Sequence, residues 1–290
     1  MLGARGVFLS SGTAFVRLSR PVSLLGIGLC VATSIRLAGG ARPLDGRDAA
    51  VLAGWMLLAA GGYVLDDVRD HEIDARVHPA RPLPSGLVSP KLAFRVAMGL
   101  LAAGAAALAR GYAGLWAVGI VTAGLLYAYG ESLKRASGLA ANATVSALLA
   151  AAAVSGGFRS GEWRAVAVLG LMTFWMNLGR EIVMDIADLP EDRRLRYRTI
   201  PLIHGARTAR RMAAVSLILG GGSGYLLPAT GAVPAATFVP GLTIINLGLL
   251  SWVVVPLAAD RDSPQRQVGL IKAAMFAYLA LIALHLVVIP

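Results

Sequence analysis

Long apolar stretches separated by short polar segments run through this chain from end to end. A membrane-spanning helix needs roughly 20 mostly apolar residues. Nine stretches reach about this length: 21–39, 48–66, 92–110, 112–130, 138–157, 164–184, 209–229, 233–258 and 268–289. The third and fourth nearly touch, so we expect a tight turn around Gly111. Because the stretches are rich in Ala, Leu and Gly and do not alternate with a period of two, they predict helices rather than strands.

The composition agrees with a membrane protein. The 290 residues are 57% hydrophobic and 15% charged, with a mean hydropathy of +0.68, whereas a soluble domain usually carries about 25% charged residues. Cys30 is the single cysteine, which excludes a disulfide framework and a cysteine-based zinc site. Residues 1–19 lack a continuous apolar run, so we expect no cleavable signal peptide and a first span that is retained.

The net charge of +11 is distributed unevenly across the predicted spans. With nine spans, 21 of the 27 Lys and Arg residues fall on the side that holds the N-terminus. Positive residues gather on the cytoplasmic side of membrane proteins, so we expect an integral protein of a bacterial-type cell membrane with these loops in the cytoplasm. Topology and anionic lipid account for the basic excess, and no nucleic-acid partner is expected.

The acidic residues form two short clusters on that same side. Of 16 Asp and Glu, ten lie within 66–74 and 181–192. Three aspartates of one cluster match three of the other at a constant offset of 118: Asp67, Asp70 and Asp74 with Asp185, Asp188 and Asp192. A basic, proline-containing tail follows each cluster, beginning at Arg81 and Arg198. The copies follow spans two and six, and this even separation predicts a parallel repeat.

The spacing of these aspartates suggests a metal site. On one helix, positions i, i+3 and i+7 share a face, so each copy is expected to turn three carboxylates toward a common point. Like charges so close repel each other, and Mg²⁺ removes the repulsion because it takes oxygen ligands and bridges carboxylates to substrate phosphates. The nearby Arg and Lys side chains suit diphosphate oxygens. Helix-capping acids of a solvated loop are the simpler explanation, but two copies at matched spacing argue against it.

Four segments carry a resemblance to a known family. They are DDVRDHEID (66–74), RVHPARPLPSG (76–86), LYAYGESLKR (126–135) and NLGREIVMDIADLPEDR (177–193), the last of which contains the second aspartate motif. Over nearly the whole chain the sequence resembles the UbiA superfamily of intramembrane prenyltransferases. The motifs look most like the branch of geranylgeranylglycerol-phosphate geranylgeranyltransferases and EboC-type proteins.

The resemblance implies roles for particular residues. Carried over by position, six aspartates would be the catalytic, metal-binding carboxylates: Asp67, Asp70, Asp74, Asp185, Asp188 and Asp192. Substrate binding would fall to Asp66, Arg81, Tyr127, Lys134, Asn177, Arg180 and Arg198. The implied fold is a single UbiA-like domain, 1–290: an all-α bundle of nine transmembrane helices around a central cavity, with parallel-related motif halves of about 1–157 and 158–290.

Two of these residues have a second interpretation. Asp66 stands where the family has Asn, and it is either an extra ligand or a carboxylate hydrogen-bonded at a helix end. Tyr127 either shields a carbocation through its ring face or anchors the chain at the membrane interface.

The sequence therefore predicts Mg²⁺-dependent transfer of a prenyl group from a polyprenyl diphosphate to a small acceptor, with release of diphosphate. An alcohol or polyol phosphate is one candidate acceptor. The first alternative is a terpene cyclase on the same scaffold, which would need no acceptor. A cation-coupled secondary transporter is a weaker alternative, because transporters usually place ion sites near the midplane on inverted repeats.

Overall fold

A computed structural model describes residues 13–40, 42–128, 133, 136–261 and 263–287 of the chain. All regular elements in this part are helices, and eight of them are long and apolar enough to cross a membrane. The chain forms two compact units. The first comprises the described residues of Met1–Gly28 and Leu44–Glu131, and the second those of Leu29–Pro43 and Ser132–Pro290.

The eight candidate spans agree with eight of the nine predicted stretches. They are α2 (Pro21–Gly39), α3 (Gly46–Arg69), α5 (Pro90–Ala109), α8 with α9 (Gly138–Val154, Gly157–Ser160), α10 (Arg164–Ala187), α13 with η1 and η2 (Ala206–Ser223, Gly224–Leu226, Pro228–Thr230), α14 with η3 and α15 (Ala235–Leu249, Leu250–Val254, Val255–Ala258) and α16 (Pro264–Val287). The polytopic helical fold is thus confirmed.

The fourth predicted span, 112–130, corresponds to a shorter helix. Helix α6 (Leu115–Ala128) has 14 residues, or about 21 Å at 1.5 Å per residue, against about 30 Å of hydrocarbon. It is apolar but too short to count as a span within the described residues. The prediction of nine transmembrane helices is therefore not confirmed. The turn predicted around Gly111 is present between α5 and α6.

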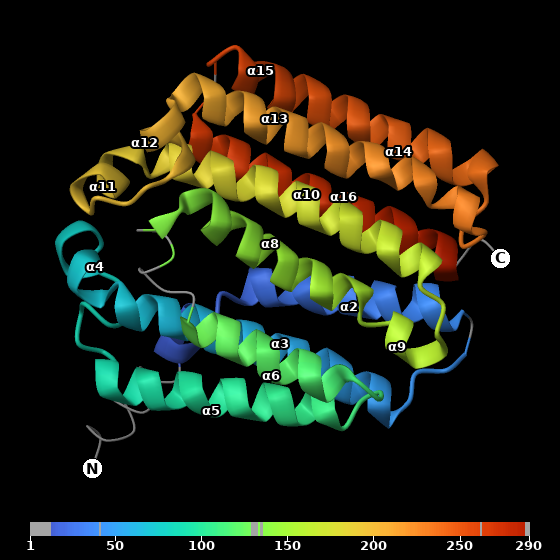
Figure 1. The fold of residues 1–290 in the computed structure, drawn as a ribbon, viewed down its shortest axis with the longest axis horizontal. Helices are drawn as coiled ribbons and strands as arrows, with labels where there is room; N and C mark the ends of the chain where they lie inside the picture. Colours follow the sequence, from blue (N-terminus) through green and yellow to red (C-terminus); the bar gives the residue numbers. More distant parts are fainter. Residues whose placement is uncertain (1–12, 41, 129–132, 134–135, 262, 288–290) are drawn as a thin grey trace. The chain divides into compact units, whose positions relative to one another are not determined.

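In the first unit, α3 packs along α5 and α6 (Figure 1). Glycines bring α3 and α5 close together: a Cβ on Gly61 would lie 3.0 Å from the Leu101 side chain and 3.1 Å from the carbonyl oxygen of Ala97. Asp45 and Asp48 form a capping box at the start of α3. The buried Asp48 also accepts a hydrogen bond from the Tyr112 hydroxyl, which lies after α5.

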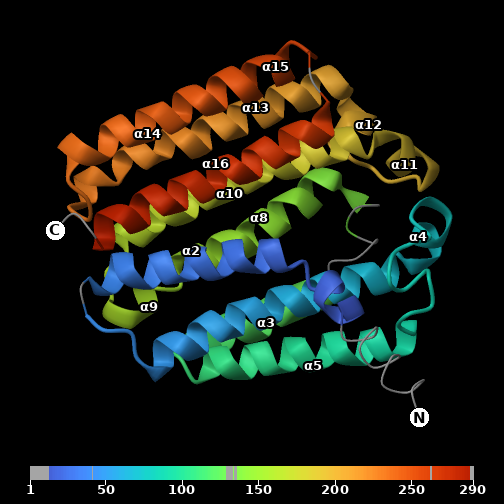
Figure 2. The ribbon, with the colours of Figure 1, turned by 180° about the vertical axis from the view of Figure 1, so that it is seen from behind.

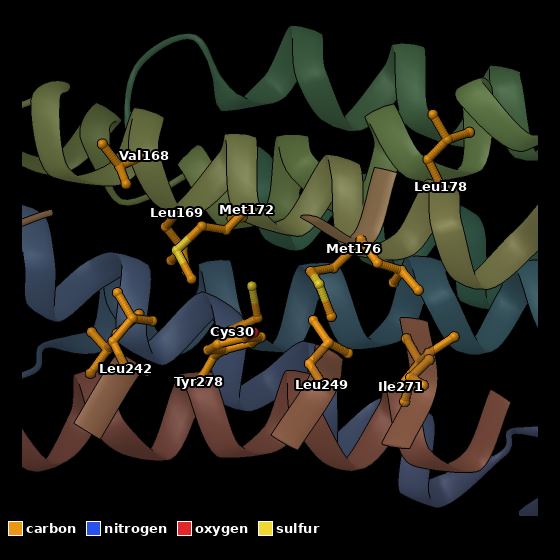
Figure 3. Close-up of a cluster of buried hydrophobic side chains, with 14 of the residues drawn as sticks. Cys30, Val168, Leu169, Met172, Met176, Leu178, Leu242, Leu249, Ile271 and Tyr278 are labelled. Carbon is orange, nitrogen blue, oxygen red and sulfur yellow. The ribbon is translucent and has the colours of Figure 1, made fainter. Parts of the chain in front are cut away.

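In the second unit, α10 is the most buried long helix and packs against α8, α13 and α16 (Figure 2). Its apolar side chains form a core with the second part of α2 and with α14 and α16. Figure 3 shows Met172 and Met176 of α10 in this core, together with Cys30 of α2 and Tyr278 of α16. The core fixes α10 on several sides, and the second aspartate cluster lies at the end of this helix.

Helices α3 and α10 correspond closely. Each has 24 residues, and the offset of 118 between the aspartate motifs holds at both helix ends. The close glycine contact is also repeated, because a Cβ on Gly179 of α10 would lie 2.8 Å from the Leu217 side chain and 3.1 Å from the carbonyl oxygen of Ala213 on α13. Each unit thus contains the same kind of helix pair, which is α3 with α5 in the first unit and α10 with α13 in the second.

Candidate functional site

Each aspartate motif spans a junction between two helices. Asp70 is at once the C-cap of α3 and the N-cap of α4 (His71–Val77). Asp188 holds the same double position between α10 and α11 (Leu189–Arg194). The expectation that each motif lies along the face of one continuous helix was therefore wrong, although the two copies depart from it in the same way.

The physical reasons for the break can be traced in the sequence. Nearby carboxylates repel each other along a continuous helix. Negative charge is favourable at a helix N-terminus because of the macrodipole, and the first turns of the short helices hold Glu72 and Asp74 in α4 and Glu191 and Asp192 in α11. In the second copy, Pro190 lies in the first turn of α11. Pro190 has no backbone N–H, so it cannot donate the hydrogen bond that would continue α10. The chain therefore ends the long helix at the middle aspartate and begins a short one.

In the first unit, Asp67 is paired with a basic residue at the start of α2. A guanidinium nitrogen of Arg20 lies 2.9 Å from a carboxylate oxygen of Asp67, and the guanidinium carbon lies 4.9 Å from the centre of the Tyr63 ring. Arg20 has a positive φ of 52°, so its backbone is in the left-handed region. Burial alone would lower the pKa of the Arg20 guanidinium, but the carboxylates of Asp67 and Asp66 raise it above its usual value. Arg20 is therefore a permanent cation at this junction.

The last carboxylate of the first motif is also paired. Asp74 is buried on α4, and one guanidinium nitrogen of Arg81 donates to both of its oxygens at 2.6 and 2.7 Å. Arg81 itself is about half exposed, with a side-chain exposure of 45%. The basic tail thus folds back onto the motif and places a half-exposed cation beside the buried acid.

Asp66 and Tyr127 take part in helix-end contacts through their backbones. The Asp66 carbonyl accepts the Asp70 N–H at 2.9 Å. Arg69 donates to the Leu126 carbonyl at 3.4 Å and to the Tyr127 carbonyl, and so caps the end of α6. The Tyr127 side chain is 53% exposed. The roles of both residues in substrate binding stay predictions.

In the second unit, a buried polar network links α8 to α10. The Asn142 amide on α8 donates to a carboxylate oxygen of Asp185 at 2.7 Å. Ser146 donates to the Asn142 carbonyl at 2.7 Å and accepts from the Asn177 amide at 3.2 Å. Arg180 donates to the Asn177 side-chain oxygen at 3.3 Å and pairs with Glu181. The structure thus brings together three of the predicted site residues, Asn177, Arg180 and Asp185.

The remaining predicted residues of the second motif lie beyond the end of α10. Asp188 is exposed, whereas Asp192 is buried on α11, as its counterpart Asp74 is on α4. The Arg198 side chain is exposed, and its carbonyl accepts the Gly138 N–H at 2.9 Å, which ties this loop to the start of α8. Lys134 lies outside the described residues.

The carboxylate oxygens of the motifs are suitable ligands for magnesium, but the described residues form no complete set of metal ligands. Among them, no three His, Cys, Asp or Glu side chains are grouped closely enough to hold a metal ion. The expectation of three converging carboxylates in each motif is therefore not confirmed. Mg²⁺ usually takes only one or two carboxylates and completes its shell with waters and substrate phosphates. The oxygen donors at each junction suit that mode of binding.

Two contacts were not predicted from the sequence. Arg20 pairs with Asp67, and Asn142 donates to Asp185. Arg20 had a detectable signal, because it directly precedes Pro21 at the start of the first span. Asn142 stands near the start of an otherwise apolar stretch, where polar residues are expensive and commonly functional.

The long apolar helices and the paired acidic junctions define an integral, polytopic membrane protein with carboxylate sites at helix ends. The chain belongs to the UbiA prenyltransferase family, whose sequence model matches residues 27–284, and it is an enzyme of the prenyltransferase class. The resemblance drawn from the motifs is thereby confirmed.

Curated relatives cover most of the chain. The digeranylgeranylglyceryl phosphate synthase of Halobacterium salinarum is 32% identical over 277 residues, covering 92% of this chain and 97% of that protein. The enzyme of the same name from Methanothermobacter thermautotrophicus is 33% identical over 219 residues, with 74% and 76% covered. These names agree with the branch that the motifs indicated.

Solved structures share the fold. A digeranylgeranylglyceryl phosphate synthase structure superposes with a TM-score of 0.78 at 19% identity, covering 96% of this chain and 99% of that one. A UbiA homologue from Archaeoglobus fulgidus, determined with GPP and Mg²⁺, superposes with a TM-score of 0.59 at 17% identity, covering 92% and 99%.

Proposed function

We propose that this enzyme transfers a prenyl group from a polyprenyl diphosphate to the hydroxyl of a glycerol-phosphate-type acceptor, with Mg²⁺ as cofactor. The observation that carries the proposal is the repeated helix junction, at which Asp70 and Asp188 each occupy the C-cap position of one helix and the N-cap position of the next. A duplicated arrangement of acids at helix ends suits a diphosphate, which carries several negative charges and binds proteins through Mg²⁺. The relative of A. fulgidus was determined with GPP and Mg²⁺, which supports this choice of ligand.

The reaction divides into breaking one bond and forming another. The C1–O bond of the prenyl diphosphate breaks, and its electron pair leaves with the diphosphate. The resulting allylic cation is captured by a lone pair of the acceptor hydroxyl, which forms a C–O ether bond and loses its proton. Mg²⁺ held by the motif aspartates would neutralise charge that develops on the leaving diphosphate.

The residues of the chain would assist at defined points. Arg81, half exposed and already beside Asp74, is placed to donate to diphosphate oxygens while it keeps the acid oriented. Arg20 would act in the same way beside Asp67. The polar network around Asn177 and Arg180 would bind polar parts of the substrates.

The acceptor is the finer part of the proposal. Relatives named digeranylgeranylglyceryl phosphate synthase favour a prenylated glycerol phosphate over an aromatic acceptor. We also propose that the fourth predicted stretch, 112–130, crosses the membrane and that both junctions then face the cytoplasm, because 21 of 27 basic residues lie on that side of the nine-span topology. The bacterial-type membrane, the ninth span and the central cavity stay predictions.

The decisive experiment is turnover by the purified protein in lipid nanodiscs. Labelled geranylgeranyl diphosphate is supplied with Mg²⁺, with and without geranylgeranylglyceryl phosphate, and both the labelled lipid and released pyrophosphate are measured. We expect a labelled ether only when the acceptor is present. A labelled hydrocarbon or alcohol formed without acceptor would instead support the cyclase.

Site variants separate the motif from the rest of the protein. Asp70→Asn and Asp188→Asn should each lower turnover by at least about 100-fold, because loss of a ligand at a metal site typically costs this much or more. Glu162→Gln is the matched control, since Glu162 is an exposed acid outside both clusters. Normal turnover in both aspartate variants would refute the assignment of the site.

A further inference from the structure

In the second unit, the motif carboxylate of Asp185 accepts a buried hydrogen bond from Asn142. Both residues are almost fully buried, with exposures of 1% and 4%, and they come from different helices, α8 and α10. Because an ionised carboxylate only accepts hydrogen bonds, the group of Asn142 that faces Asp185 is its NH₂, 2.7 Å from the carboxylate oxygen. Asn142 thus holds one oxygen of a proposed metal ligand in a fixed position.

The backbone beside Asn142 is tied to α10 by further hydrogen bonds. The Ser146 hydroxyl, fully buried one turn further along α8, donates to the backbone carbonyl of Asn142 and accepts from the Asn177 amide. The Asn177 side-chain oxygen in turn accepts from Arg180. These hydrogen bonds join α8 to α10 one turn from the Asn142–Asp185 contact, and so hold the Asn142 backbone in place relative to α10.

The matching aspartate of the first motif has a different kind of partner. Asp67 is paired with the cation of Arg20, whereas Asp185 accepts from a neutral amide. An amide orients a carboxylate without adding a positive charge beside it. Asn142 therefore orients Asp185 through a donor that carries no charge of its own.

We infer that Asn142 is a positioning residue for metal binding, which orients the Asp185 carboxylate toward the Mg²⁺ of the prenyl diphosphate complex. This inference rests on the proposed function, because it takes Asp185 to be a metal ligand. Groups that hydrogen-bond to metal ligands and fix their orientation typically contribute 10–100-fold to metal affinity. Asn142 would contribute in this way without touching the substrate.

The test uses binding as well as turnover. Mn²⁺ replaces Mg²⁺, and its binding to the purified protein with inorganic pyrophosphate is followed by electron paramagnetic resonance, so that no reaction occurs. We expect Asn142→Ala to weaken Mn²⁺ binding roughly 10–100-fold and to raise by a similar factor the Mg²⁺ concentration that gives half-maximal turnover. At saturating Mg²⁺ the kcat should return close to that of the wild type.

Matched variants distinguish a metal effect from a packing effect. Asn142→Leu keeps the branched shape and the number of side-chain heavy atoms without the donor, and it should reproduce the metal-binding defect even if Asn142→Ala fails to fold. Thr144→Val, on the same helix, removes a hydroxyl that donates to the Ala140 carbonyl within its own helix, and it should leave Mn²⁺ affinity unchanged. Apparent melting temperatures measured without divalent cations show which variants are folded.

The outcomes separate this inference from the proposed function. If Asp185→Asn abolishes Mn²⁺–pyrophosphate binding and folded Asn142 variants bind normally, the positioning role is refuted and the site assignment stands. If Asp185→Asn binds normally, the site assignment itself fails. If both single variants bind weakly and the double variant binds no more weakly than Asp185→Asn, the two residues act as one unit, as inferred.

Discussion

The contact between Gly156 and helix α2 allows a stability effect to be worked out from the structure. Gly156 has helical dihedral angles, φ −61° and ψ −28°, so its own backbone would accept an alanine. A Cβ there would nevertheless lie 2.2 Å from the Ser34 carbonyl oxygen and 2.7 Å from the Ile35 nitrogen. Both are backbone atoms of α2, and no side-chain rotation can relieve the contact. Gly156→Ala therefore forces the two segments roughly 1 Å apart.

That separation has two costs. Overpacking of a tight interior typically destabilises by about 1–3 kcal/mol. The movement also stretches the 2.9 Å hydrogen bond from the Gly156 N–H to the fully buried Ser34 hydroxyl, and leaving such groups without a partner costs about 1–3 kcal/mol more. We expect the free energy of unfolding of the second unit to fall by about 3 kcal/mol.

The assay is the apparent melting temperature in detergent or nanodiscs, followed by intrinsic fluorescence. For a protein of this size, 1 kcal/mol corresponds to about 2–4 °C, so a decrease of about 6–12 °C is expected. The control is Gly222→Ala in α13, where a Cβ meets nothing within 4 Å. Replacing that glycine should be neutral or stabilising by about 0.5–1 kcal/mol. Equal melting temperatures for the two variants would refute the argument from close backbone contact.

Three further predictions concern the site and the helix ends. Removing divalent cations with EDTA should abolish turnover, and Mg²⁺ should restore it whereas Ca²⁺ should not, because Mg²⁺ demands shorter bonds and octahedral geometry; equal recovery with Ca²⁺ would contradict a magnesium site. Arg81→Ala should raise the KM for prenyl diphosphate about 10–100-fold, the equivalent of one charge-assisted hydrogen bond, with Arg81→Lys in between; an unchanged KM would exclude a diphosphate contact. Arg69→Ala removes the donors to the Leu126 and Tyr127 carbonyls and should lower the unfolding free energy by about 1 kcal/mol, measured as a melting temperature; no change would mean that the end of α6 needs no cap.

The spans could be predicted well because their signal is local. A helix in hydrocarbon must satisfy its backbone hydrogen bonds within itself, so the length and position of an apolar run largely decide where a span lies. The first span, predicted at 21–39, is the helix Pro21–Gly39. The fourth apolar run was long enough in the sequence, but its described helix ends at Ala128 after 14 residues.

The acidic motifs could be located from the sequence, but their local geometry could not. Counting i, i+3 and i+7 assumes a continuous helix, and Asp70 and Asp188 end their helices. In the second copy, Pro190 indicates in the sequence that the helix breaks. In the first copy the only indication is the run of like charges, whose effect on the helix depends on how nearby basic residues pair with them.

The partners of the carboxylates depend on which helices pack together. Arg20 is 47 residues from Asp67, and Asn142 is 43 residues from Asp185. No periodicity relates residues at such separations, so only the tertiary structure reveals the pairs. Arg81 could be anticipated, because it lies seven residues from Asp74 in a tail that both motifs share.

The repeated glycine contact has a consequence for the direction of the carboxylates. Gly61 lies six residues before Asp67, and Gly179 lies six residues before Asp185. Each glycine fixes the rotation of its helix about the long axis, since only the face without a side chain can lie against the neighbouring helix. Inserting one residue between glycine and aspartate would rotate the carboxylate by about 100° and advance it by about 1.5 Å. The six-residue spacing thus links an apolar helix contact to the direction in which the aspartate side chain at the end of the helix points.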